Sequence, residues 1–302
     1  MAKIILTGTS LGSEQAEDLY HQLHNVLGRN HPGQLQIDMS SVSFVRPSGV
    51  MALVIAAKTW QEQTGRQTVL IQVQTQVHAY LDRVDLFSTC GEFIETDDEL
   101  APAQRYSRSP ESRSVVELLP ISGDIDQNSK GVSAAVRRVS HVLCERYGAD
   151  HPNIPRLCTL VAELGSNITH SQDSGYLLVQ SYADRLDERW RVSIAIGDCG
   201  IGIERSLRTR RSILQTYKSQ LKSGSDFIAL SLREGITSLR SKRGVGLPLV
   251  KNTVRDWKGS LSIRSQGSRL TLPFTAPLVA HDDLPIMPGT QVMINAAGVF
   301  VP

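Results

Sequence analysis

The sequence predicts a two-domain α/β protein. Its 302 residues suffice for two domains of ordinary size, since domains average about 150 residues. Residues 103–114, AQRYSRSPESRS, are small, basic and turn-forming, and they interrupt the apolar patterns on either side. On both sides, strand-like and helical patterns alternate. We therefore expect one domain at residues 1–102, a linker at 103–114 and a second domain at 115–302.

The composition is that of an ordinary folded protein. Hydrophobic residues make up 40% and charged residues 21% of the chain, which excludes wholesale disorder. The formal net charge of +2 excludes a global attraction to DNA or anionic lipid. No apolar run reaches the roughly 18 residues of a membrane helix, and the start MAKIILTGTS lacks the pattern of a signal peptide, so we expect a cytoplasmic protein. The four cysteines have no CxxC spacing and predict neither a zinc site nor a disulfide framework.

In the first domain the patterns predict helices alternating with buried strands. A helix is expected from Ser13 to Gly28, where apolar residues recur at helical spacing, with Ser13 capping its start and Gly28 its end. The segments LQIDMS and VLIQVQ are typical of buried strands. Two more helices are expected at about 48–60 and 77–84. The sheet that these strands join need not be all parallel.

In the second domain, two helices followed by a hairpin indicate an α/β sandwich. The last strand of the hairpin alternates, with Trp190, Val192 and Ile194 on one face and polar or small residues on the other, as a sheet covered on one side requires. The expected elements are, in order, a strand at 115–121, helices at 133–146 and 155–170, and strands at 176–182 and 189–197.

The first of three segments with chemical potential is LVAELGSNITH, residues 160–170. At about 100° per residue, Glu163, Asn167 and His170 fall on one side of the predicted helix, beside its apolar stripe. Gly165 costs this helix about 1 kcal/mol relative to Ala, which is tolerable where a neighbour packs closely. A solvated helix side would give the same pattern, so this segment alone does not establish a site.

The second segment is IAIGDCGIGI, in which a strand delivers Asp198 at its end. A carboxylate fixed there can accept a hydrogen bond from an exocyclic amine, and Gly200 and Gly202 would let the backbone pass close to a flat base. Glycines after a strand also form simple turns. The segment therefore needs independent support.

The third segment is SKRGVGLPLVKNTV, in which Gly244 and Gly246 precede an apolar helical run that begins at Leu247. The exposed amides of a glycine-rich loop at a helix N-terminus bind phosphate, and Lys242 and Arg243 add local positive charge. The pattern predicts a phosphate site only in combination with other motifs.

In this order, the three segments resemble the N, G1 and G2 boxes of the GHKL ATPases. This nucleotide-binding fold is shared by histidine kinases, Hsp90, gyrase B, MutL and the anti-sigma-factor serine kinases. The resemblance extends over about residues 115–295, because IRSQGSRL and PGTQVMINA are similar to the closing strands of the family. It implies a GHKL (Bergerat) α/β sandwich with a mixed sheet.

The resemblance implies a role for each residue of the motifs. Asn167 would help to hold a Mg²⁺ ion that bridges the phosphates of ATP, as suits a hard oxygen ligand. Glu163 would be the base that orients or deprotonates the attacking hydroxyl or water. Asp198 would hold the adenine amine, with Thr290 nearby and Ser268 as an alternative to Thr290. The remaining residues would shape the nucleotide cleft: Gly200, Gly202, Gly244, Gly246 and Leu247.

The resemblance also implies that residues 203–243 form the lid over the nucleotide. The run ERSLRTRR within this segment could bring arginines to the phosphates. A charged run is more often a solvated face, which is the interpretation we favour. The arginines concerned are Arg205, Arg208, Arg210 and Arg211.

The first domain resembles the STAS domains of anti-sigma-factor antagonists. The stretches IDMSSVSFVRPSGVMALVIAAKTW and VQTQVHAYLDRVDLF carry this resemblance over roughly residues 1–100. In such domains an Asp-Ser-Ser-Gly loop provides the phosphoacceptor serine, whereas this chain has Arg46-Pro47-Ser48-Gly49, in which the usual acceptor is missing. Ser48 could substitute as the acceptor, but at a predicted helix N-terminus we interpret it as a helix cap. A generic small α/β domain used for homodimerisation is the alternative for this domain.

Together the resemblances imply a STAS-like plus GHKL regulatory protein that binds Mg-ATP and acts on a protein partner. It would be an ATPase or serine/threonine protein kinase of the anti-sigma-factor type, with a STAS-type antagonist or a sigma-like regulator as the partner. The alternative is a switch without catalysis, in which ATP changes the exposed protein surface. Nucleic-acid binding is disfavoured, because aromatic residues are only 5% of the chain and no nucleic-acid motif accompanies the arginines.

Overall fold

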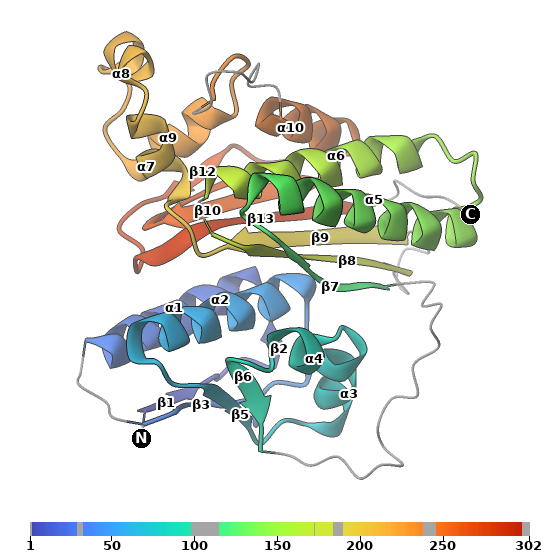
Figure 1. Ribbon diagram of the computed structural model, residues 1–302, viewed down its shortest axis with the longest axis vertical. Helices are drawn as coiled ribbons and strands as arrows, with labels where there is room; N and C mark the ends of the chain where they lie inside the picture. Colours follow the sequence, from blue (N-terminus) through green and yellow to red (C-terminus); the bar gives the residue numbers. More distant parts are fainter. Residues whose placement is uncertain are drawn as a thin grey trace. The chain divides into compact units, whose positions relative to one another are not determined.

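The computed structural model describes residues 2–28, 33–97, 115–171, 173–183, 190–237 and 246–297 of the chain. It is an α/β protein of two compact units, Met1–Glu111 and Ser112–Pro302 (Figure 1). The predicted linker at 103–114 lies outside the described residues. No helix among the described residues is both long and apolar enough to cross a membrane.

The first unit contains a four-stranded parallel sheet with helices between its strands. The strand order is β1-β3-β5-β6, and every ladder of this sheet is parallel. A second, very short sheet pairs β2 with β4. The elements are β1 (Ala2–Ile5), β2 (Ser10–Leu11), α1 (Ser13–Leu27), β3 (Leu35–Asp38), β4 (Phe44–Val45), α2 (Pro47–Thr64), β5 (Thr68–Ile71), α3 (Thr75–Arg83), α4 (Leu86–Cys90) and β6 (Ile94–Thr96).

The predicted caps of this unit are only partly confirmed. Helix α1 ends with Gly28 at its C-cap as predicted, but its N-cap is Gly12, with Ser13 as the first helical residue. Helix α2 begins with Pro47, and its N-cap is Arg46, which makes no side-chain capping bond. The interpretation of Ser48 as a cap is therefore wrong. Proline is well suited to the first helical position, because the N–H that it lacks has no partner within the helix.

The second unit is built on a seven-stranded sheet. Its strand order is β12-β11-β10-β13-β9-β8-β7, and every described ladder is antiparallel. The predicted mixed sheet is therefore wrong for this unit, since the parallel ladders of the chain are confined to the first unit. The strands are β7 (Val115–Ile121), β8 (Gly175–Ala183), β9 (Trp190–Asp198), β10 (Ser260–Gln266), β11 (Ser268–Leu272), β12 (Val279–His281) and β13 (Met287–Ala297).

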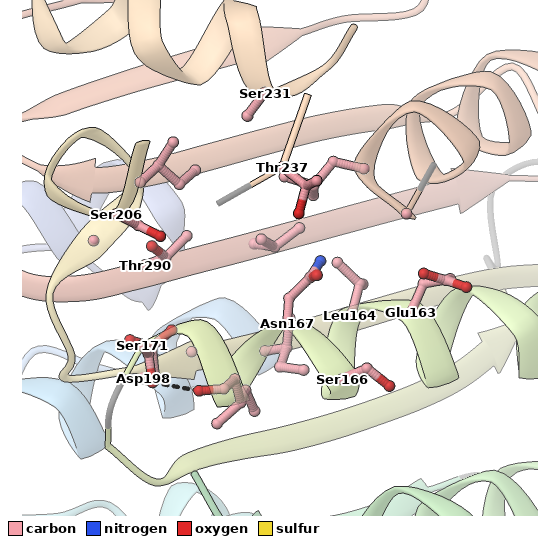
Figure 2. Close-up of a pocket in the computed structure, with 18 of the residues that line it drawn as sticks. Glu163, Leu164, Ser166, Asn167, Ser171, Asp198, Ser206, Ser231, Thr237 and Thr290 are labelled. Carbon is pink, nitrogen blue, oxygen red and sulfur yellow. Dashed lines mark hydrogen bonds between the residues drawn. The ribbon is translucent and has the colours of Figure 1, made fainter. Parts of the chain in front are cut away.

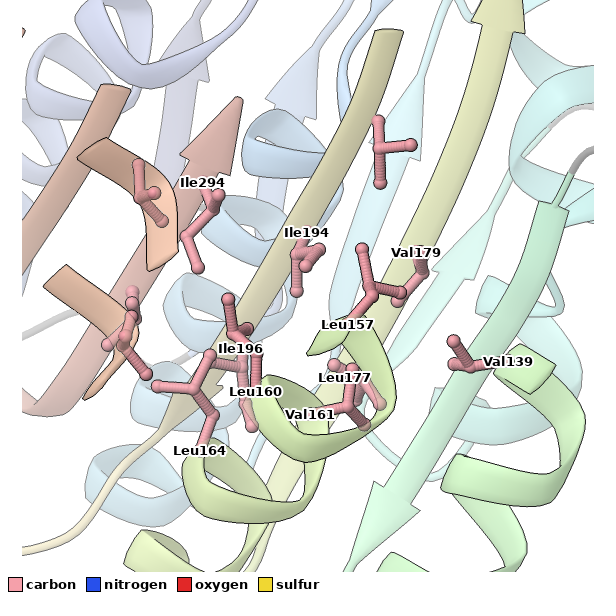
Figure 3. Close-up of a cluster of buried hydrophobic side chains, with 14 of the residues drawn as sticks. Val139, Leu157, Leu160, Val161, Leu164, Leu177, Val179, Ile194, Ile196 and Ile294 are labelled. Carbon is pink, nitrogen blue, oxygen red and sulfur yellow. The ribbon is translucent and has the colours of Figure 1, made fainter. Parts of the chain in front are cut away.

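Three helices cover one face of this sheet, α5 (Ile125–Tyr147), α6 (Asn153–Asn167) and α10 (Gly246–Asp256) (Figure 1). The apolar stripe of α6 packs on the apolar face of β8 and β9, where Val192, Ile194 and Ile196 are buried as the alternation predicts (Figure 3). The close packing expected at Gly165 is present, because a Cβ there would lie 2.8 Å from Val132 Cγ2 on α5. Helix α6 is therefore packed firmly in the core, and this packing fixes the position of its C-terminal end.

Helix α5 begins eight residues earlier than predicted. Its N-cap is Asp124, whose Oδ1 accepts hydrogen bonds from the backbone N–H groups of Asp126 and Gln127 at 3.1 and 3.0 Å. The first turns are polar on most sides, so hydrophobic periodicity does not reveal them. Within them, Asn128 Nδ2 donates to Gly165 O at 3.1 Å and ties the two helices together.

Residues 202–237, which we call the helical module, hold three short helices that were predicted only as a lid. These are α7 (Gly202–Arg208), α8 (Arg211–Tyr217) and α9 (Gly224–Ser231). They share a small core of their own, formed by Leu207, Ile213, Phe227 and Leu230. The last residues of the predicted lid, 238–243, lie outside the described residues.

Candidate functional site

The second unit contains a cavity of about 410 Å³ beside the C-terminal end of α6. Its size is within the range of small-molecule sites. Helix α6, the end of β9, β13, the start of α10 and the helical module surround it (Figure 2). Most of the predicted site residues line it: Glu163, Asn167, Asp198, Gly202, Gly246, Leu247 and Thr290. Gly200 is adjacent to the cavity through Asp198, and Gly244 lies outside the described residues.

The α6 wall of the cavity presents Glu163 and Asn167 one helical turn apart. Both side chains are partly exposed, and Asn167 is the last residue of the α-helix. The start of α10 lies against the carboxylate, since a Cβ on Gly246 would be 2.7 Å from Glu163 Oε2. The α-helix predicted to reach His170 ends at Asn167, and His170 belongs to a following 3₁₀ turn. Two oxygen-bearing side chains thus stand beside a helix N-terminus.

The floor of the cavity is a close meeting of three backbone segments around Asp198. This carboxyl is only 6% exposed, and its Oδ1 accepts a hydrogen bond from the N–H of Gly200 at 2.8 Å. The oxygen of Gly200 in turn accepts from the N–H of Gly289 at 2.7 Å, and the N–H of Ile201 donates to Ser171 O at 2.9 Å. A Cβ on Gly200 would collide with the backbone of Ser171, and one on Gly289 with that of Asp198.

Thr290 is connected to the helical module through Ser265. The sequence does not single out Ser265 as a site residue. Ser265 Oγ, at the end of β10, accepts a hydrogen bond from Ile203 N at 2.8 Å and lies 3.3 Å from Thr290 Oγ1. The sequence signals only a strand here, because a serine on a strand has no distinctive pattern. The alternative candidate Ser268 does not line the cavity.

The helical module forms the wall opposite α6. Ile203, Ser206 and Leu207 of α7 line the cavity, as do Ser231 of α9 and the following Thr237. All five lie within the predicted lid, but the sequence does not single them out, because the arginines of the same stretch dominate its pattern.

The arginines of α7 point away from the cavity. At about 100° per residue, Arg205 and Arg208 fall on the side of the helix opposite Ile203 and Leu207. Both arginines are exposed, as is Arg211, whereas Arg210 is partly buried. The interpretation of this run as a solvated face is therefore confirmed for the exposed three.

The module is fastened to the sheet by the carboxylate of Asp282. Asp282 Oδ2 accepts from Ser225 Oγ at 2.7 Å, and Oδ1 accepts from Ser225 N at 2.9 Å and from Ser268 Oγ at 2.6 Å. Burial by itself would raise the pKa of Asp282, but the hydrogen bonds from Ser268 and Ser225 outweigh it and hold the pKa below its ordinary value. The start of α9 is thereby bound to β11 and to the residue that follows β12.

The charged side chains in the described lining of the cavity are both acidic. Glu163 and Asp198 are its charged residues within the described ranges, and the cations Lys242 and Arg243 lie outside them. The described wall therefore offers acceptors for donor groups and for cations. An anionic group would be favoured only near the N-terminus of α10.

Comparison with known proteins identifies the first unit. A family model for the STAS domain matches residues 7–100. The first unit contains a STAS domain. STAS domains typically act in protein–protein interactions. No GHKL family model supports the second unit, and no curated protein matches the chain.

Replacing Gly289 with Ala should open the floor of the cavity. The new Cβ would collide with the backbone of Asp198, and Gly289 has φ +75°. We therefore expect the free energy of unfolding to fall by about 3 kcal/mol or more. Gly235→Ala is the matched control, because Gly235 has φ +79° but nothing within 4 Å of its Cβ position, and it should cost about 1 kcal/mol. Amide hydrogen exchange in β9 and β13 measures the difference, and equal effects of the two variants would refute the close approach.

Replacing Asp282 with Asn should loosen the helical module. A hydrogen bond to a charged group stabilises a fold by about 1.5–3 kcal/mol, more than a bond between neutral groups does. Removing the charge of Asp282 should therefore raise the population of chains with an open module roughly tenfold. Proteolysis between α8 and α9 reports this opening, with Asp283→Asn as the control. Folding lowers the pKa of Asp282. The stabilisation by its carboxylate is therefore complete above the unfolded-state pKa of about 3.9 and is lost as the pH falls through the folded-state pKa. Equal proteolysis of both variants and the native chain would contradict the role of Asp282.

Proposed function

We propose that the chain is a regulatory protein that binds Mg-ATP in the cavity of its second unit and acts on a protein partner. One observation carries the proposal. Glu163, Asp198, Gly246 and Thr290 come from four segments far apart in the sequence, yet they line one cavity together with Asn167. This convergence is what the resemblance to the GHKL ATPases implies, and a set of unrelated turns would not produce it.

The cavity has the features that an adenine nucleotide requires. Asp198 offers a buried carboxylate that is oriented by Gly200 N–H, which suits an exocyclic amine. Leu164, Ile196 and Val292 give apolar lining for a flat ring. At the other side, the N-terminus of α10 lines the cavity and lies against Glu163, since a Cβ on Gly246 would be 2.7 Å from Glu163 Oε2. Exposed helix N-termini favour phosphate groups.

The α6 wall has an oxygen that suits magnesium. Asn167 carries an amide oxygen, and Mg²⁺ prefers such hard oxygens together with phosphate oxygens. A magnesium ion held by Asn167 would supply positive charge beside the phosphates, which the described lining lacks.

Within this proposal, each residue has a limited task. Asp198 and Thr290 would orient the base, and Ser265 would hold the hydroxyl of Thr290 in place. Glu163 would accept a proton from an attacking hydroxyl or water, which is the catalytic version of the proposal. In that version the chain is an ATPase or a serine/threonine kinase of the anti-sigma-factor type.

The alternative is a switch that binds ATP without using it. Pro47 favours it, because a STAS domain without the usual acceptor serine would serve as a docking surface rather than as a substrate. The cavity also favours it, since the helical module forms one wall and would respond to an occupant. In both versions the partner is a protein, with a STAS-type antagonist or a sigma-like regulator as our proposal.

Asp198→Asn tests nucleotide binding. Asparagine keeps the shape but turns one acceptor into a donor, so we expect ATP affinity to fall by more than about 1.4 kcal/mol, or tenfold. Calorimetric titration of ATP with magnesium measures it, with the exposed Asp256→Asn as the control. Absence of ATP binding to the native chain would overturn the proposed function.

Glu163→Gln separates the enzyme from the switch. The amide cannot take the proton, so phosphate release or transfer should fall by at least about a hundredfold, whereas ATP affinity should stay within about threefold. Both quantities are measured on the same samples. If partner regulation persists in this variant, catalysis is dispensable and the switch is the better description.

A further inference from the structure

The exposed side chains of the helical module carry an excess of positive charge. Residues 202–237 contain seven Lys and Arg residues against three Asp and Glu residues. Six of the seven cations are exposed: Arg205, Arg208, Arg211, Lys218, Lys222 and Arg233. The whole chain has a formal net charge of only +2, so this density is a local property of the module.

The acidic residues of the module neutralise its cations only in part. Asp226 is engaged in its own helix start, where its Oδ2 accepts from the N–H groups of Lys222 and Ser223 at 2.8 and 2.9 Å. Glu204 pairs with Arg208 at 2.8 Å. Glu234 is exposed near the end of the module. The exposed surface of the module thus retains an excess of cations.

Two of the guanidinium groups are held in place by aromatic rings. Arg208 lies 4.6 Å from the ring centroid of Phe227, and Arg233 lies 5.8 Å from that of Tyr217. Arg233 also donates a hydrogen bond to Gln220 Oε1 at 3.1 Å. Side chains held in this way lose less conformational freedom when they bind a carboxylate.

We propose that the exposed cations of the module, with Arg205 and Arg208 on the outer side of α7 among them, form a docking surface for an acidic segment of a protein partner. Arginines recognise carboxylates by paired hydrogen bonds, which gives such a surface its specificity. A protein is favoured over a nucleic acid because Phe227 and Tyr217 are occupied by guanidiniums and present no ring for base stacking. The STAS domain of the same chain also indicates a protein-binding role.

The docking surface is joined to the cavity through a single helix. The inner side of α7 lines the cavity with Ser206 and Leu207, whereas its outer side carries Arg205 and Arg208. A partner on the outer side and a ligand in the cavity therefore act on the same module, so each should change the affinity of the other. This coupling, unlike the docking itself, rests on the proposed function.

The test uses the full chain and a fluorescein-labelled oligoglutamate peptide, with binding followed by fluorescence anisotropy in the absence of nucleotide. The triple variant Arg205→Glu, Arg208→Glu and Arg211→Glu should weaken peptide binding by at least about thirtyfold. The control variant Lys130→Glu, Arg137→Glu and Arg255→Glu makes the same change of charge at exposed positions elsewhere in the second unit and should stay within about threefold. Equal weakening in both would overturn the docking surface.

A milder variant guards against misfolding. Arg205→Gln with Arg211→Gln leaves Arg208 on Phe227 and should still weaken peptide binding by about fivefold. No change in this variant would overturn the proposal even if the triple variant fails to fold. A DNA duplex that binds more tightly than the peptide would overturn the choice of a protein partner.

The coupling has its own measurement, which keeps it distinct from the docking. Saturating peptide should change the ATP affinity of the native chain at least about fivefold. If ATP does not bind at all, the proposed function fails while the docking result stands. If ATP binds with unchanged affinity, the docking surface is independent of the cavity and the coupling is wrong.

Discussion

The second unit depends on a place where three backbone segments meet with no side chain between them. Gly200 contacts the backbone of Ser171 and accepts the hydrogen bond of Gly289 N–H, while Asp198 Oδ1 binds the N–H of Gly200. The end of β9, the turn after α6 and the start of β13 are thereby held at one point. Because side chains would force these segments apart, this contact determines where Asp198 lies relative to Asn167.

Helices α6 and α7 each have two functions in the second unit. Helix α6 buries Leu160 and Leu164 in the core and presents Glu163 and Asn167 to the cavity, so the site is supported by rigid packing. Helix α7 lines the same cavity and carries exposed arginines on its other side. Asp282 anchors the module to which α7 belongs. A cavity with one rigid and one anchored wall is suited to a ligand-controlled switch.

The sequence predicts the rigid part of this unit better than the anchored part. The alternation of β9 and the stripe of α6 follow from burial, and the spacing of Glu163 and Asn167 follows from helical geometry. Ser265 and Asp282 could not be predicted, because their partners are distant in sequence and a single polar residue has no periodicity. The antiparallel sheet was missed for a related reason, since strand order depends on contacts between distant segments rather than on local patterns.

Under the proposed function, these segments form one Mg-ATP site. Hydrogen–deuterium exchange of the full chain with and without Mg-ATP is the measurement that examines all of them at once. We expect slower exchange in four separate stretches, at the end of α6, after β9, at the start of α10 and at the start of β13, with little change in the STAS domain. Unchanged exchange in those four stretches, or protection confined to the STAS domain, would contradict it.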